Sequence, residues 1–322
     1  MRKFLCLVLL LLLIGCGSPA SSGETTVPSE LTQPPETQPY IQEEAVALAE
    51  APPPPSWTVL QPEAPGIREE RTAEAVIDYS NSEEGYVMVC YTAPTEKRMK
   101  VRITGPTTTY TYNLPAGAWT VFPLSDGNGE YKATVYINTT DSKYATVMST
   151  GFPVELEDEF APFLRPNQYV DYTEAEDTVA IGAELCDGLT HPLEKVAAVY
   201  DYVVAQLQYD YDKAATVKSG YLPVLDTVLA EKKGICFDYA ALMTAMLRSQ
   251  EVPCKLVVGY AGSTYHAWIS VWAEEEGWID GAVFFNGHSW KRMDPTFASS
   301  SNRSPEIMEF IEKGNYTVKY LY

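Results

Sequence analysis

The pattern of hydrophobic and polar positions divides the chain into four regions. An apolar run comes first, a proline-rich polar region follows, short runs rich in Val, Thr, Tyr and Ile come next, and helical patterns that change to strand patterns complete the chain. A change of period indicates a change of structure, so we expect a signal segment, a tether and two folded domains. Their expected bounds are 1–16, 17–70, 71–156 and 157–322.

The region 71–156 is predicted to be all-β. It consists of short alternating runs such as GYVMVCYT at 85–92 and GEYKATVYIN at 129–138, and turn sequences such as SDGNG at 125–129 separate them. Short strands at this spacing predict a sandwich of immunoglobulin-like type. Because it holds no cluster of acids, bases or nucleophiles, we favour a spacer that packs on the next domain, with a carbohydrate- or protein-binding module as the alternative.

The region 157–322 combines helices with strands. A helix is predicted after His191-Pro192, since Pro is favoured in a first turn and an apolar stripe follows. A second helix is predicted in GICFDYAALMTAML at 234–247, with apolar residues lining one face. After Pro253 the pattern changes to strands with short turn-like links. Helices followed by an antiparallel sheet indicate an α+β domain.

The charge of the chain narrows the possible partners. The formal net charge is −20 at pH 7, and no segment resembles a basic face. This composition argues against nucleic-acid binding and against adhesion to anionic lipid headgroups. We interpret the excess of acidic residues as a solvated surface.

The N-terminus has the layout of a secretory signal. Arg2 and Lys3 precede an apolar run that is too short for a membrane-spanning helix. The residues LIGC at 13–16 resemble the bacterial lipobox, which implies cleavage before Cys16 and a diacylglycerol on its sulfur. An ordinary signal peptide is the alternative. We therefore expect an exported protein, held by lipid at the outer face of the cytoplasmic membrane, with the region 17–70 as a disordered tether.

The cysteine pattern excludes two kinds of site. There is no C-x-x-C pair and no regular spacing, which argues against a zinc site and against a disulfide scaffold. One or two disulfides stay open as an alternative in an exported protein. After loss of Cys6 with the signal and lipidation of Cys16, the remaining cysteines are Cys90, Cys186, Cys236 and Cys254.

Cys236 is the candidate nucleophile because it stands where a loop becomes a helix. Unpaired N–H groups at a helix N-terminus stabilise a thiolate and can hold an oxyanion. Of the three histidines, His191 is expected to cap a helix or to lie at the surface, and His288 to lie in an exposed turn. His266 opens the alternating strand HAWISV, and Asp294 ends a later strand. The alternative is that these residues have structural roles only. Cys236 would then be a buried core residue, His266 a hydrogen-bonded residue of its strand, and Asp294 a residue that forms a turn.

Three segments resemble the core motifs of the transglutaminase-like superfamily: GICFDYAALMTAMLRSQEVPCKLVVGY, YHAWISVW and WKRMDPTF. The resemblance covers roughly 193–297 and implies a papain-like α+β core. It also implies that Cys236 is the nucleophile, His266 the general base and acid, and Asp294 the acid that orients the imidazole. The second oxyanion donor stays open among four upstream residues, which are Gln206, Gln208, Tyr209 and Tyr211.

The expected chemistry is acyl transfer through a thioester. We favour hydrolysis of peptide or amide bonds in protein or peptide substrates at the cell surface or in the cell wall, because water is always available. Transglutaminase cross-linking of glutamine and lysine side chains is the first alternative, and a non-catalytic binding or adhesion module is the second. We expect no cofactor and no metal, because the sequence contains no recognisable calcium loop.

Overall fold

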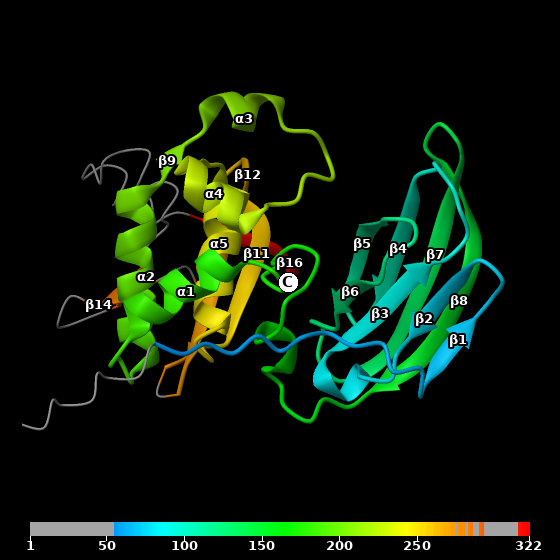
Figure 1. The fold of residues 1–322 in the computed structure, drawn as a ribbon, viewed down its shortest axis with the longest axis horizontal. Helices are drawn as coiled ribbons and strands as arrows, with labels where there is room; N and C mark the ends of the chain where they lie inside the picture. Colours follow the sequence, from blue (N-terminus) through cyan, green and yellow to red (C-terminus); the bar gives the residue numbers. More distant parts are fainter. Residues whose placement is uncertain (1–54, 275, 281–282, 286–289, 293–314) are drawn as a thin grey trace, which may run out of the picture. The chain divides into compact units, whose positions relative to one another are not determined.

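The computed structural model describes residues 55–274, 276–280, 283–285, 290–292 and 315–322, and Figure 1 shows their arrangement. Between residues 55 and 154 the regular elements are strands and one short 3-10 helix, and the described α-helices lie beyond residue 154. The described residues all belong to one unit, Pro53–Tyr322.

The strands between residues 69 and 154 pair into two antiparallel sheets. The first has the order β1-β2-β3-β6, with β1 Glu69–Arg71, β2 Ala75–Asp78, β3 Tyr86–Tyr91 and β6 Thr120–Pro123. The second has the order β5-β4-β7-β8, with β4 Met99–Thr104, β5 Thr109–Leu114, β7 Gly129–Thr140 and β8 Lys143–Val154.

Burial along these strands follows the alternation in the sequence. In β4, Met99, Val101 and Ile103 are buried while the residues between them are at least partly exposed. Successive side chains of a strand point to opposite faces, so one face of this sheet joins the core and the other meets solvent. The expected all-β region is therefore observed, whereas its immunoglobulin-like type stays a prediction.

Residues 55–70 differ from the expected disordered tether. The N–H of Thr58 donates to the carbonyl of Ser249 at 2.9 Å, and the side chain of Gln250 donates to the carbonyl of Ser56 at 3.1 Å. Residues 69–71 form β1. This part of the expected tether is ordered because its backbone groups find hydrogen-bond partners on folded elements, which a polar composition does not reveal.

Five α-helices are observed between residues 176 and 248: α1 Glu176–Cys186, α2 Pro192–Gln206, α3 Tyr211–Thr216, α4 Leu225–Glu231 and α5 Cys236–Arg248. The expected cap is confirmed, because Nδ1 of His191 accepts the N–H of Leu193 at 3.2 Å. The sequence patterns did not predict α3, which is short and has no buried residue.

Helix α5 is buried on all sides, which differs from the expected one-sided helix. Every residue from Asp238 to Arg248 is buried. One side packs against β11 (Cys254–Ala261) and β12 (Thr264–Ala273), and the other meets α1, α2 and α4. Small residues and Thr244 allow this close packing where the sequence pattern indicated a polar face.

The sheet beside α5 is antiparallel and has the order β13-β12-β11-β16, with β13 Gly277–Asp280 and β16 Tyr316–Leu321. The sequence patterns missed β16, which pairs with β11 from far along the chain. Two short pairs complete the strands: β14 (Val283–Phe285) with β15 (Trp290–Arg292), and β9 (Gln208–Tyr209) with β10 (Lys233–Gly234). Helices followed by an antiparallel sheet are thus observed.

Candidate functional site

Cys236 is the first residue of α5, as the sequence indicated, and its side chain is half-buried. The other described cysteines, Cys90, Cys186 and Cys254, are buried, and all four are free thiols. Burial raises the pKa of Cys90 and of Cys186, and it raises the pKa of Cys254 to about 11. Cys236 is therefore the described thiol that a substrate can reach.

The chain before Cys236 is fixed by a close contact that only glycine allows. A Cβ at Gly234 would lie 2.7 Å from Cβ of Asp238. Gly234 also belongs to β10, which pairs in parallel with β9. The turn that leads into the helix is consequently held from both sides, which fixes the position of Cys236.

Asp238 stabilises the first turn of α5. Its Oδ2 accepts the backbone N–H of Ile235 at 2.8 Å. The same oxygen lies 2.7 Å from Nζ of Lys213, and Oδ1 accepts the hydroxyl of Tyr221 at 2.5 Å. A carboxylate in this position satisfies a free helix N–H group and interacts favourably with the helix dipole.

His266 lies on β12, as expected, and its side chain is 4% exposed. It is directly opposite Gly259 of β11. Its ring centroid is 6.2 Å from that of Trp268 and 6.5 Å from that of Tyr316. A rigid strand and aromatic neighbours fix the imidazole well.

The structure places the strand of His266 beside the helix of Cys236. Helix α5 packs on β12. Burial raises the pKa of Tyr265, the residue before His266, and smaller contributions come from nearby tyrosines and from Cys236. Asp294, the third predicted member, lies outside the described residues, as does Cys16.

The four candidates for the second oxyanion donor all lie close to β10. Oε1 of Gln206 accepts a hydrogen bond from Nζ of Lys232 at 3.3 Å, which occupies the amide oxygen but not the Nε2 donor. Gln208 and Tyr209 form β9 itself, and the ring of Tyr209 lies 4.9 Å from that of Tyr211. The pairing of β9 with β10 therefore brings this segment to the residues before Cys236, but does not select one donor.

The sequence patterns did not indicate Lys213 and Tyr221, which the structure brings to Asp238. They precede Asp238 by 25 and 17 positions, and neither belongs to a periodic pattern. The one sequence feature that indicates such partners is Asp238 in the first turn of an apolar helix, because a buried carboxylate requires hydrogen-bond partners.

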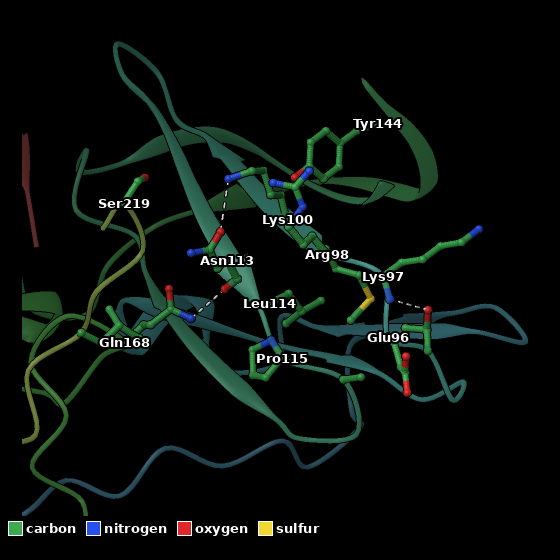
Figure 2. Close-up of a pocket in the computed structure, with 14 residues that line it drawn as sticks. Glu96, Lys97, Arg98, Lys100, Asn113, Leu114, Pro115, Tyr144, Gln168 and Ser219 are labelled. Atoms are coloured by element: carbon green, nitrogen blue, oxygen red, sulfur yellow. Dashed lines mark hydrogen bonds between the residues drawn. The ribbon is translucent and has the colours of Figure 1, made fainter. Parts of the chain in front are cut away.

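A cavity of the described residues lies away from this site. Its volume is about 630 Å³, and Figure 2 shows it between Arg98, Lys100 and Asn113 of the all-β part and Gln168 and Ser219. None of the residues predicted for the site lines it.

Two observations concern metals and membranes. In the described ranges, no three His, Cys, Asp or Glu side chains are grouped closely enough to ligate a metal ion. The helices of the same ranges are all too short or too polar to act as a membrane span.

Comparisons with known proteins identify the domain that carries Cys236. The family model described as the transglutaminase-like superfamily matches residues 179–281. A protein-glutamine gamma-glutamyltransferase of Pseudomonas aeruginosa is 26% identical over 145 residues, which cover 40% of this chain and 20% of that protein. The uncharacterized protein YebA of Bacillus subtilis is 27% identical over 105 residues, covering 27% of this chain and 14% of that protein.

The chain thus spans well under two thirds of the length of these relatives. Among solved structures, the periplasmic domain of TgpA from Pseudomonas aeruginosa, bound to ethylmercury, aligns with 76% of this chain and 100% of that one, with a TM-score of 0.34 and 15% identity. The match of the family model covers α5, β11 and β12. Residues 179–281, which contain Cys236 and His266, therefore match the transglutaminase-like superfamily.

Proposed function

We propose that this protein is a cysteine acyl-transfer enzyme that uses Cys236 as nucleophile, His266 as general base and acid, and Asp294 as the residue that orients the imidazole. The observation that carries the proposal is the half-buried thiol of Cys236 at the start of α5, which packs on the strand of His266. The relationship to the transglutaminase-like superfamily supports it.

The reaction would proceed in two halves. The imidazole of His266 takes the thiol proton while the sulfur bonds to the substrate carbonyl carbon, and N–H groups at the start of α5 stabilise the oxyanion. The carbon–nitrogen bond then breaks, His266 returns the proton to the leaving amine, and a thioester remains. Water or a second amine attacks the thioester, the carbon–sulfur bond breaks, and the thiol is restored.

We favour water as the acceptor and peptide or amide bonds of protein substrates as the targets. Cross-linking of glutamine and lysine side chains is the alternative, and the similarity to a protein-glutamine gamma-glutamyltransferase of Pseudomonas aeruginosa supports it. The same two half-reactions produce both outcomes, so the relative access of water and amine to the thioester decides between them.

We also propose that the enzyme is exported and lipid-anchored through Cys16. The lipobox-like residues 13–16 support this location. We retain the division into a signal at 1–16, an immunoglobulin-like spacer at 71–156 and a catalytic domain at 157–322, with a tether that ends before the ordered residues from 55 onward.

Alkylation tests the nucleophile. Iodoacetamide at neutral pH should label Cys236 far faster than Cys90, Cys186 or Cys254, with peptide mass spectrometry identifying each site. The substitution His266→Ala should slow labelling of Cys236 without changing the other three. Equal labelling of all four cysteines would contradict the enzyme proposal and favour a non-catalytic binding module.

The acceptor can be tested with a glutamine-containing peptide, with and without an added primary amine. Deamidation releases ammonia and leaves glutamate, transamidation releases ammonia and incorporates the amine, and peptidase activity releases a shorter peptide. Cys236→Ala is the control and should abolish all three products. Ammonia release with complete amine incorporation would reject hydrolysis as the main outcome.

A further inference from the structure

Residues 211–222, here called the α3 segment, contain no fully buried residue. They include α3 and the chain that leads from it towards α4, and each of them is exposed or only half-buried. In Figure 1, α3 lies outside the group formed by α2, α4 and α5. A segment without buried apolar contacts opens readily unless polar contacts hold it.

The polar contacts of the α3 segment converge on the residues around Cys236. Just before the segment, the N–H of Asp210 donates to the carbonyl of Gly234 at 2.8 Å. Within the segment, Lys213 and Tyr221 both bind the carboxylate of Asp238. Both ends of the segment are therefore hydrogen-bonded to the residues around Cys236, through Gly234 at the first end and Asp238 at the second.

The contact with Asp238 is the strongest of these anchors. The carboxylate is 0% exposed, the Lys213 side chain is 25% exposed, and Nζ lies 2.7 Å from Oδ2. Nζ of Lys213 also lies 2.5 Å from the hydroxyl of Tyr221, so the three groups form a closed network. Burial and the hydrogen bond to Asp238 raise the pKa of Tyr221, which keeps its hydroxyl protonated as a donor. Buried charge-assisted hydrogen bonds of this kind are geometrically specific.

The α3 segment contacts α5 on one side and the all-β part on the other. The Tyr221 ring lies 6.3 Å from that of Phe237, the residue after the nucleophile. On the other side, a Cβ at Gly220 would lie 2.5 Å from Nδ2 of Asn113 in β5. Ser219 and Leu222 line the cavity in Figure 2. The all-β part and α5 thus both fix where the segment lies.

We propose that Asp238 is a positioning residue which, through Lys213 and Tyr221, holds the α3 segment as one wall of the entrance to Cys236. This inference rests on the proposed function, and it adds that access of an extended acyl substrate depends on the network. Asp238 does not touch the reacting atoms in this scheme. It positions both the first turn of α5 and the segment beside it.

Two variants disrupt the network without leaving a buried charge unpaired. Tyr221→Phe keeps the ring beside Phe237 and removes one hydrogen bond. The double substitution Lys213→Met with Asp238→Asn removes both charges together, and the amide can still accept the N–H of Ile235. Lys218→Met is the matched control, because Lys218 is an exposed residue of the same segment.

Two measurements on the full chain test the proposal. Endoproteinase Glu-C in phosphate buffer should cut after Asp212 at least tenfold faster in both network variants than in the control, because no variant changes the residue that the protease recognises. The digestion is run without denaturant, where circular dichroism shows that all variants are folded. The second measurement compares how fast a large reagent, a polyethylene-glycol maleimide, and a small reagent, iodoacetamide, label Cys236. The ratio of these two rates should change at least threefold in the network variants and stay unchanged in the control.

Each outcome separates this inference from the proposed function. Unchanged cleavage and an unchanged labelling ratio, with folded variants, would overturn the positioning role. If Cys236 shows no enhanced labelling, the enzyme proposal fails while the cleavage experiment still reports on the network. With a glutamine peptide that supports turnover, the network variants should raise KM and leave kcat within about twofold.

Discussion

Gly259 on β11 lies directly opposite His266 on β12, and the backbone at Gly259 has no space for a side chain. A Cβ at this position would come within 2.0 Å of the carbonyl oxygen of Thr317 on β16 and within 2.8 Å of the Trp268 ring. The pairing of β11 with β16 also shifts register between Val258 and Gly259. A missing side chain thus allows β16 and Trp268 to approach the strand that supports the candidate base.

The substitution Gly259→Ala should therefore destabilise the protein, because the clash with Thr317 involves backbone that cannot move without breaking β16 pairing. We expect a loss of about 2–4 kcal/mol of unfolding free energy, measured by urea denaturation. Gly151→Ala is the control, since a Cβ there would lie 3.6 Å from the nearest backbone oxygen. Equal stability of the two variants would show that β16 does not constrain Gly259.

Arg248 joins four separate parts of the chain from a buried position at the end of α5. It is 1% exposed, and it donates to the carbonyls of Cys254 at 2.9 Å, Arg165 at 2.6 Å and Tyr322 at 2.7 Å. Arg248→Met should cost at least about 3 kcal/mol of unfolding free energy, because three buried carbonyls lose their donor. Arg102→Met, at an exposed position, should cost less than about 0.5 kcal/mol.

The conservative variant sharpens this test. Arg248→Lys keeps the charge, but one ammonium lacks the planar fork that serves three separate carbonyls. It should recover less than half of the lost stability. Full recovery would mean that the charge and not the hydrogen-bond geometry stabilises the fold.

Two buried tyrosines predict opposite effects for the same chemical change. The Tyr112 hydroxyl is buried without a hydrogen-bond partner in the described part of the chain, whereas the hydroxyl of Tyr172 donates to the carbonyl of Leu164 at 2.9 Å. Tyr112→Phe should raise the unfolding free energy or leave it unchanged, while Tyr172→Phe should lower it by about 1 kcal/mol. Thermal and urea unfolding measure both. A loss at Tyr112 would reveal a bound water at its hydroxyl.

Cys254 should make stability depend on pH in the alkaline range. Burial raises its pKa from 9.0 to about 11, so the folded state binds the thiol proton more tightly than the unfolded state does. This contribution is complete below pH 9 and is lost as the pH rises through 11, with a slope of at most ~1.4 kcal/mol per pH unit.

The measurement compares the wild type with Cys254→Ala by urea unfolding at pH 8, 9, 10 and 11. The variant loses packing at every pH, but it lacks the thiol that titrates. The stability difference between the two proteins should therefore shrink as the pH rises, because tyrosine titration affects both equally. A constant difference would contradict the raised pKa.

Local patterns predicted much of the fold. The cap at His191, the start of α5 at Cys236 and the strand of His266 were each predicted within a few residues. These features follow from contacts between residues that are close in sequence, such as the Nδ1 of His191 with the N–H of Leu193. The all-β region was predicted for a similar reason, since alternation records which face of each strand is buried.

Other features depend on contacts that leave no local pattern. Full burial of α5 results from helices on one side and a sheet on the other, and the pattern of Leu242, Met243, Met246 and Leu247 shows one side alone. The order of residues 55–70 depends on hydrogen bonds to Ser249 and Gln250, far along the chain.

The sequence by itself determined that a cysteine begins a helix and that a histidine lies on a strand, in segments that resemble the motifs of the transglutaminase-like superfamily. Only the tertiary structure decided which residues surround them. It inserted β16 beside β11, which makes Gly259 necessary, and it brought Lys213 and Tyr221 to Asp238. The reason is physical: periodicity records whether a side chain is buried, whereas the partner of a buried carboxylate depends on how distant segments pack.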